Sequence, residues 1–75
     1  MGTALFLVIF SQHAWWVDFE GEAHGPFDTL EAAALEGREM ARMTAHSGRR
    51  SQLLCPDTHG RYHVVWSSLR ESQAA

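Results

Sequence analysis

The chain has 75 residues, of which 45% are hydrophobic and 20% charged, and its formal net charge is −3 at pH 7. A chain of this length forms one domain that buries only about 60% of its unfolded surface, so its core is small. The acidic balance excludes an overall positive field that would draw the protein onto nucleic acid or an anionic membrane. The single cysteine, Cys55, excludes an internal disulfide and is typical of a reducing compartment.

The first predicted element is a strand over residues 4–10, which is apolar at every position. Strands that are apolar on both faces lie inside a sheet and are covered on each side. We therefore expect this strand in the middle of the sheet. Its alternation divides the large side chains into two sets, one of Leu5, Leu7 and Ile9 and the other of Phe6, Val8 and Phe10.

A hairpin is predicted next, because residues 11–13 form a short polar connection to a second alternating strand over residues 14–20. Residues 21–26 contain Gly25 and Pro26, and we expect them to form a loop that leads into a helix. The second strand is expected to point Trp15, Val17 and Phe19 inward and Trp16, Asp18 and Glu20 outward.

The stretch from Phe27 to Gly48 predicts an amphipathic helix. Asp28 or Thr29 can cap its start, and Gly48 suits the left-handed position that ends a helix. Because the inward side consists mainly of small residues, with Gly37 near its centre, the helix should lie close against a sheet of large side chains. The residues on this side are Leu30, Ala33, Ala34, Gly37, Met40, Ala41 and Thr44.

A second hairpin follows the helix. Residues 51–55 predict a short strand that ends at Pro56, since proline cannot join an interior ladder. The turn residues up to Gly60 separate it from a last strand over residues 61–68. This strand alternates, with Tyr62, Val64 and Trp66 expected on one face and His63, Val65 and Ser67 on the other.

The order strand, strand, helix, strand, strand predicts an α+β fold: a four-stranded, mainly antiparallel sheet with one helix packed on one face. We expect a single domain over residues 1–75, with a core of about residues 4–69 and a frayed tail at residues 70–75. The strand order stays open, because neither hairpin dictates how it joins the other. The second face of the sheet must meet water or a partner.

The chain also resembles a family of short bacterial domains, the domain of unknown function 2188. The resemblance rests on the Trp15–Val17 strand, on the helix entry at residues 27–29 followed by an alanine-rich helix, and on the turn at residues 59–61. It covers roughly residues 6–66. In place of the family's usual Asp-Gly turn, this chain has Thr-His-Gly. The resemblance implies a β-β-α-β-β fold in a bacterial protein, and no known activity.

Metal binding and catalysis have weak support in the sequence. His59 and His63 have a spacing that occurs in zinc sites, but they fall in a turn and on a strand, and no Cys-x-x-Cys pair accompanies them. Cys55 with His63 across the second hairpin is the one pairing that resembles a nucleophile and its base. Because so small a domain rarely encloses a ligand cavity, we predict a non-enzymatic protein without metal or cofactor.

The leading hypothesis is a binding or assembly module that forms a homodimer through the sheet face that the helix leaves open. One helix cannot cover both sets of the first strand. Each Å² of apolar surface that stays exposed loses about 25 cal/mol of stabilising free energy. We predict an interface formed by one of the two sets, either Phe6, Val8 and Phe10 or the opposite one, together with Trp16. A symmetric dimer is the simplest arrangement that would bury it.

The alternative hypothesis is a nucleic-acid-associated module, in which Arg49, Arg50 and Arg61 cluster at one end of the sheet. No membrane role is expected, because the apolar run at residues 4–10 is too short to span a bilayer. No lysine or arginine precedes that run, as a secretory signal would need, so we expect a cytoplasmic protein.

Overall fold

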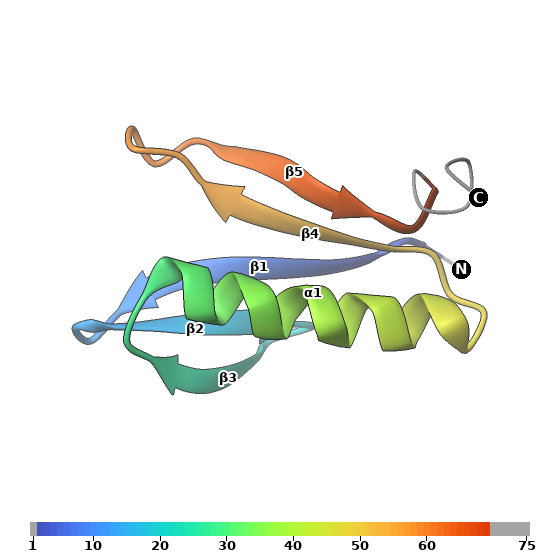
Figure 1. Ribbon diagram of the computed structural model, residues 1–75, viewed down its shortest axis with the longest axis horizontal. Helices are drawn as coiled ribbons and strands as arrows, with labels where there is room; N and C mark the ends of the chain where they lie inside the picture. Colours follow the sequence, from blue (N-terminus) through green and yellow to red (C-terminus); the bar gives the residue numbers. More distant parts are fainter. Residues whose placement is uncertain (1, 70–75) are drawn as a thin grey trace.

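The computed structural model describes residues 2–69, so the tail predicted at residues 70–75 lies outside the described residues. One α-helix lies against one face of a twisted sheet, as Figure 1 shows. The α+β class and the placement of the helix are therefore confirmed. The elements are β1 (Ala4–Ser11), β2 (Ala14–Phe19), β3 (Glu22–Phe27), α1 (Leu30–His46), β4 (Ser51–Pro56) and β5 (Tyr62–Ser67).

The sheet has five strands in the order β3-β2-β1-β4-β5. β1 lies in the middle, as its two apolar faces predicted. It pairs antiparallel with β2 and parallel with β4, and the two outer pairings, β2 with β3 and β4 with β5, are antiparallel. The sheet is thus mixed but mainly antiparallel, and the prediction of four strands is wrong by one.

The first hairpin turns through Gln12 and His13, whose positive φ angles of 52° and 62° match the tight turn that the twist of a hairpin favours. A second tight turn follows at Glu20 and Gly21, with φ angles of 51° and 86°. This turn leads into β3, where the sequence predicted a loop.

The missing strand was hidden by its composition. β3 contains Gly25 and Pro26, which weaken a strand pattern, and it lies at the edge of the sheet, where a proline need not donate to a neighbour. Its ladder with β2 shifts register between Trp15 and Val17, because Gly25 and Pro26 of β3 together lie opposite Trp16, which marks a bulge in β3 at the glycine and proline.

The helix begins and ends at residues that suit its exposed backbone groups. The Thr29 side chain accepts a hydrogen bond from the Ala32 N–H at 3.0 Å, so Thr29, and not Asp28, is the cap. After the last turn, Gly48 has a φ of 106° and its N–H donates to the Ala45 carbonyl at 3.0 Å. The predicted role of Gly48 is confirmed.

The core lies between α1 and the sheet. The small side of the helix, with Ala33, Gly37 and Ala41 fully buried, faces large side chains of the sheet, as predicted. Phe6 stacks on Phe19 with ring centroids 4.3 Å apart. The other buried apolar residues of this cluster are Ala4, Val8, Val17, Leu53, Cys55 and Trp66.

The alternation predicted for the last strand is broken by a bulge. Leu53 pairs with Trp66, but Leu54 pairs with Val64, so Val65 is an extra residue between the two pairs. Trp66 therefore lies on the helix side with Leu53, while Val64 and Tyr62 lie on the opposite side. The prediction that Tyr62, Val64 and Trp66 share one face is wrong for Trp66.

The turn between β4 and β5 is organised by Asp57, as the turn composition predicted. Its carboxylate accepts hydrogen bonds from the backbone N–H groups of His59 and Arg61, at 2.8 and 2.9 Å. The Asp57 N–H in turn donates to the Arg61 carbonyl at 2.8 Å. The hydrogen bonds from Arg61 and then His59 lower the pKa of Asp57 from its ordinary value of 3.8.

We expect the contribution of the Asp57 charge to stability to depend on pH. Because the folded state lowers the pKa of Asp57, this contribution is complete above the unfolded value of 3.8 and is lost as the pH falls through the lower folded value. The measurement is urea unfolding of the wild type and of Asp57→Asn between pH 7 and pH 2. Asparagine can accept the same hydrogen bonds without the charge. The difference between the two proteins should therefore shrink at acid pH, and a constant difference would contradict the assignment.

Candidate functional site

Among residues 2–69, no element covers the face of the sheet opposite α1. Strand alternation and register place one apolar set of β1 here, and the neighbouring strands extend it on both sides. Most of these side chains are half-buried, while Leu5 and Tyr62 are 47% and 44% exposed. We name this surface the open face and define it by Leu5, Leu7, Ile9, Trp16, Leu54, Tyr62 and Val64.

Two of the predicted interface residues lie in the core instead. Phe6 and Val8 are 1% and 0% exposed beneath α1, so they cannot contact a second chain, and this part of the prediction is wrong. Phe10 is 59% exposed but belongs to the same helix-side set, with its ring 5.0 Å from that of Trp15. The opposite set, which the sequence left as the alternative, occupies the open face.

Trp16 lies on the open face, as predicted. It pairs with Ile9 across the first hairpin, and its indole N–H donates to the Ser11 carbonyl at 2.9 Å. This bond fixes the ring over the end of β1. The half-buried indole therefore offers a rigid apolar surface with its polar atom already satisfied.

Tyr62 ties the last strand to the first. Its hydroxyl donates to the Val8 carbonyl at 2.9 Å. β4 ends at Pro56, while β1 continues to Ser11, so a backbone carbonyl of β1 near this end gains a partner from a side chain. Burial, and less strongly the nearby Cys55, raises the pKa of Tyr62, which keeps this donor protonated. The sequence carried no signal for this contact.

Polar residues are sparse on the open face. Asp18 pairs with Leu7 and is the charged residue that alternation places here among the described strands. Gln52 pairs with Leu5 and adds an uncharged polar group. The surface is therefore mainly apolar, and its centre is at Leu7, between Asp18 on β2 and Leu54 on β4.

A second surface is a groove between α1 and β5, on the helix side of the sheet. The helix lies over β1, β2 and β4, with β5 to one side of it (Figure 1). A hollow of about 390 Å³ separates the two elements, and a larger one of about 690 Å³ continues from it at the end of the helix. Trp66 lines both hollows. We name their combination the α1–β5 groove.

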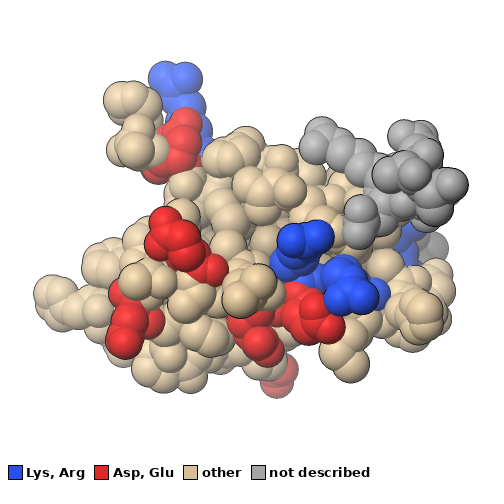
Figure 2. All heavy atoms as spheres, in the orientation of Figure 1, with Lys and Arg blue, Asp and Glu red and all other residues tan. Residues whose placement is uncertain are grey.

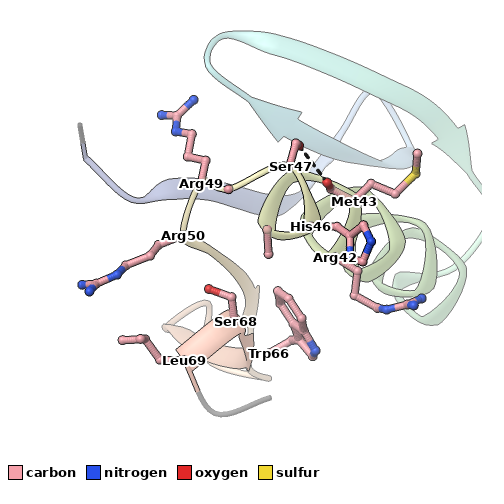
Figure 3. A pocket seen from close by; sticks show the side chains of 11 residues that line it. Arg42, Met43, His46, Ser47, Arg49, Arg50, Trp66, Ser68 and Leu69 are labelled. Carbon is pink, nitrogen blue, oxygen red and sulfur yellow. Dashed lines mark hydrogen bonds between the residues drawn. The ribbon is translucent and has the colours of Figure 1, made fainter. Parts of the chain in front are cut away.

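The walls of the α1–β5 groove carry more positive than negative charge. Arg38 and Glu31 line the smaller hollow, and Arg42, Arg49 and Arg50 line the larger. Figure 3 shows Arg42 and Arg50 on opposite sides of Trp66, one from the helix and one from the segment that enters β4. Arg42 also pairs with Glu39 at 2.8 Å, across two exposed side chains.

The predicted cluster of Arg49, Arg50 and Arg61 does not form. Arg49 and Arg50 precede β4, whereas Arg61 lies beside the far end of β4, because Pro56 pairs with Tyr62. Figure 2 likewise shows basic side chains both at the β4–β5 turn and beside the C-terminal half of α1. Arg49 pairs with Glu20 at 3.3 Å and lies 5.8 Å above the Phe19 ring. The β4–β5 hairpin thus separates Arg61 from Arg49 and Arg50, which the alternative hypothesis expected to lie together.

The candidate ligand and nucleophile residues lie at the second hairpin. Within residues 2–69, no three histidine, cysteine, aspartate or glutamate side chains lie close enough to hold a metal ion. Cys55 pairs with His63 in the β4–β5 ladder, as the sequence suggested. Cys55 is buried, and burial raises the pKa of its thiol, which disfavours the reactive thiolate.

Two further observations concern the chain as a whole. Within the described part of the chain, α1 is too short and too polar to cross a membrane. Comparison with family models, curated proteins and solved structures gives no match. The resemblance to the domain of unknown function 2188 therefore stays a prediction, and the geometry of the two surfaces carries the functional argument.

Proposed function

We propose that the protein is a non-enzymatic assembly module that forms a homodimer through the open face. The observation that carries this proposal is the set of large apolar side chains on a sheet face that α1 leaves bare. A monomeric protein rarely exposes an apolar patch of several hundred Å² without a binding role. Each large apolar side chain that becomes fully buried contributes about 1.5–3 kcal/mol.

The size of the open face fits a second copy. Five strands about 4.8 Å apart, each of about six residues, span roughly 24 by 20 Å. Two such faces bury roughly 1,000 Å² between them, near the lower limit for specific interfaces. Because a two-fold dimer uses the same patch on both subunits, a face centred on Leu7 is suited to pack on its own copy as a sandwich.

We expect the wild type to elute and scatter light as a species of about twice its 8.4 kDa chain mass. Leu7→Glu should shift it to the chain mass, because it puts a charge at the centre of the face and beside Asp18. The measurement is size-exclusion chromatography with light scattering, with circular dichroism as the check of folding.

Leu35→Glu is the matched control, since Leu35 is 70% exposed at the α1–β5 groove, on the side of the sheet opposite the open face, and should leave the mass of the dimer unchanged. Leu5→Glu, at a more exposed site of the open face, replaces Leu7→Glu if that variant does not fold. A wild-type protein that stays at the chain mass at high concentration would contradict the proposal.

A further inference from the structure

The two edges of the sheet differ in how well they are protected against another strand. β3 contains a proline and a glycine and a bulge beside them, which are devices that block edge pairing. β5 has six residues, Tyr62–Ser67, with no proline, lysine, arginine or acidic residue, and its protection is the single bulge at Val65. Among the described residues β5 pairs only with β4, so its other edge, called here the free edge of β5, is the better template for an added strand.

The α1–β5 groove lies beside this edge and is apolar at its floor. The smaller hollow has Leu53 and Trp66 beneath it and Leu35 and Val65 at its margins. Leu35 and Val65 are both exposed, at 70% and 44%. A strand added to β5 would point every second side chain toward these residues.

The Trp66 side chain is independent evidence that the groove binds a ligand, because its indole N–H lacks a hydrogen-bond acceptor within residues 2–69. The side chain is 8% exposed, and among the described residues its indole nitrogen is buried without a hydrogen-bond partner. Buried indole N–H groups usually have a partner, because an unsatisfied donor costs about 1–3 kcal/mol. An acceptor in the groove would reach this buried nitrogen only after a shift of the Trp66 ring or of the side chains that cover it.

The charge of the groove selects the chemistry of the occupant. Arg38 and Arg50 line the groove without an ion pair among residues 2–69, whereas Glu31 is the single acidic residue among the described residues that line it. A second copy would bring the same arginines against them, and like charges repel. We propose that the α1–β5 groove binds an extended acidic segment of a partner protein, which adds to the free edge of β5. Every second residue of the segment faces the groove, and these residues are apolar beside Trp66 and Val65 and acidic beside Arg38 and Arg50.

The test uses a short fluorescein-labelled peptide in which every second residue faces the groove, these residues being valine or leucine at the centre and glutamate at both ends, with threonine between them. The salt concentration is about 20 mM, where screening is weak. We expect its fluorescence anisotropy to rise on titration with the wild type. The joint change Arg38→Gln and Arg50→Gln should weaken binding about fivefold, because two exposed ion pairs are lost. Val65→Lys should abolish binding. In a ¹⁵N spectrum, the peptide should shift the Trp66 indole N–H signal, which Trp66→Phe identifies.

Matched controls separate the groove from general attraction. Arg61→Gln removes one positive charge at the other end of β5, and because Arg61 lines neither hollow, binding should stay unchanged. Leu7→Glu, on the open face, should bind the peptide as the wild type does. A peptide with lysine in place of glutamate should not bind, and neither should one with methylated backbone nitrogens, which cannot donate to the edge of β5.

Several results would overturn the proposal. These are the absence of binding at low salt, binding that ignores the Arg38, Arg50 and Val65 changes, and equal binding of the methylated peptide. Tighter binding of a labelled oligothymidylate at the same residues would assign the groove to nucleic acid instead. If Val65→Lys altered the oligomeric state and the peptide did not bind, the free edge of β5 would belong to a second copy.

Discussion

Replacing Phe6 with alanine is expected to lower the free energy of unfolding by about 3–5 kcal/mol. Phe6 is 1% exposed beneath α1, and its ring stacks on Phe19. The change removes the largest fully buried side chain and leaves a cavity in a core that is already small. A domain of this length has a total stability of about 4–11 kcal/mol, so the variant should lose a large part of it.

Phe10→Ala is the matched control, because it changes the same residue type on the same strand and on the same side. Phe10 is 59% exposed and packs mainly on Trp15, so we expect a loss of about 1 kcal/mol. Urea unfolding followed by circular dichroism measures both variants. If the two losses were equal, the division of β1 into a helix-side core and an exposed end would be wrong.

Gly37→Val is expected to destabilise the fold by about 2 kcal/mol, although valine has the better helix propensity. A Cβ at this position would lie 2.7 Å from Leu53 Cδ1 and 3.4 Å from Val17 Cγ2. Real Cβ atoms do not approach a neighbour as closely as the first of these distances, so the helix must move away from the sheet or Leu53 must leave its rotamer. Thermal and urea unfolding measure the change.

The neighbour that limits residue 37 is identified by a double-mutant cycle of Gly37→Ala and Leu53→Ala. Leu53→Ala alone should cost about 2–5 kcal/mol, because it empties space in the core. In its presence the new methyl group of Gly37→Ala meets no Cδ1 atom, so the two losses together should be smaller than their sum by at least about 0.5 kcal/mol. Strict additivity would show that the helix does not approach the sheet at Leu53.

Much of this arrangement could be predicted from periodicity and residue size. Small residues on one side of α1 predicted a close approach to large side chains, and Gly37 faces Leu53 and Val17. The two apolar faces of β1 predicted its central position. These patterns were reliable because each depends on several residues that all carry the same signal.

Other features depend on tertiary context that no local pattern contains. β3 was missed because Gly25 and Pro26 read as a loop unless the edge position of the strand is known. Trp66 was expected on the same face as Tyr62 and Val64, and it lies on the other face because one extra residue at Val65 reverses the alternation. A strand that is apolar on both sides cannot reveal which set the helix will cover.

Of the two candidate surfaces, the sequence predicted one and missed the other. The existence of the open face was predicted because one helix can cover only one of the two faces of a sheet. Trp16 was assigned to this face correctly. The α1–β5 groove was not predicted, because it depends on where the helix lies across the sheet. The arginine cluster failed because the β4–β5 hairpin carries Arg61 to the end away from Arg50.

The parallel pairing of β1 with β4 has a consequence for synthesis of the chain. β1 can pair with β2 as soon as the first hairpin is synthesised. Its other edge pairs with β4, which is synthesised only after the whole of α1. Until then, the most hydrophobic strand has an unpaired backbone, and such an edge readily joins a neighbouring nascent chain. Truncation before Ser51 should therefore yield an aggregating fragment and not a smaller stable domain.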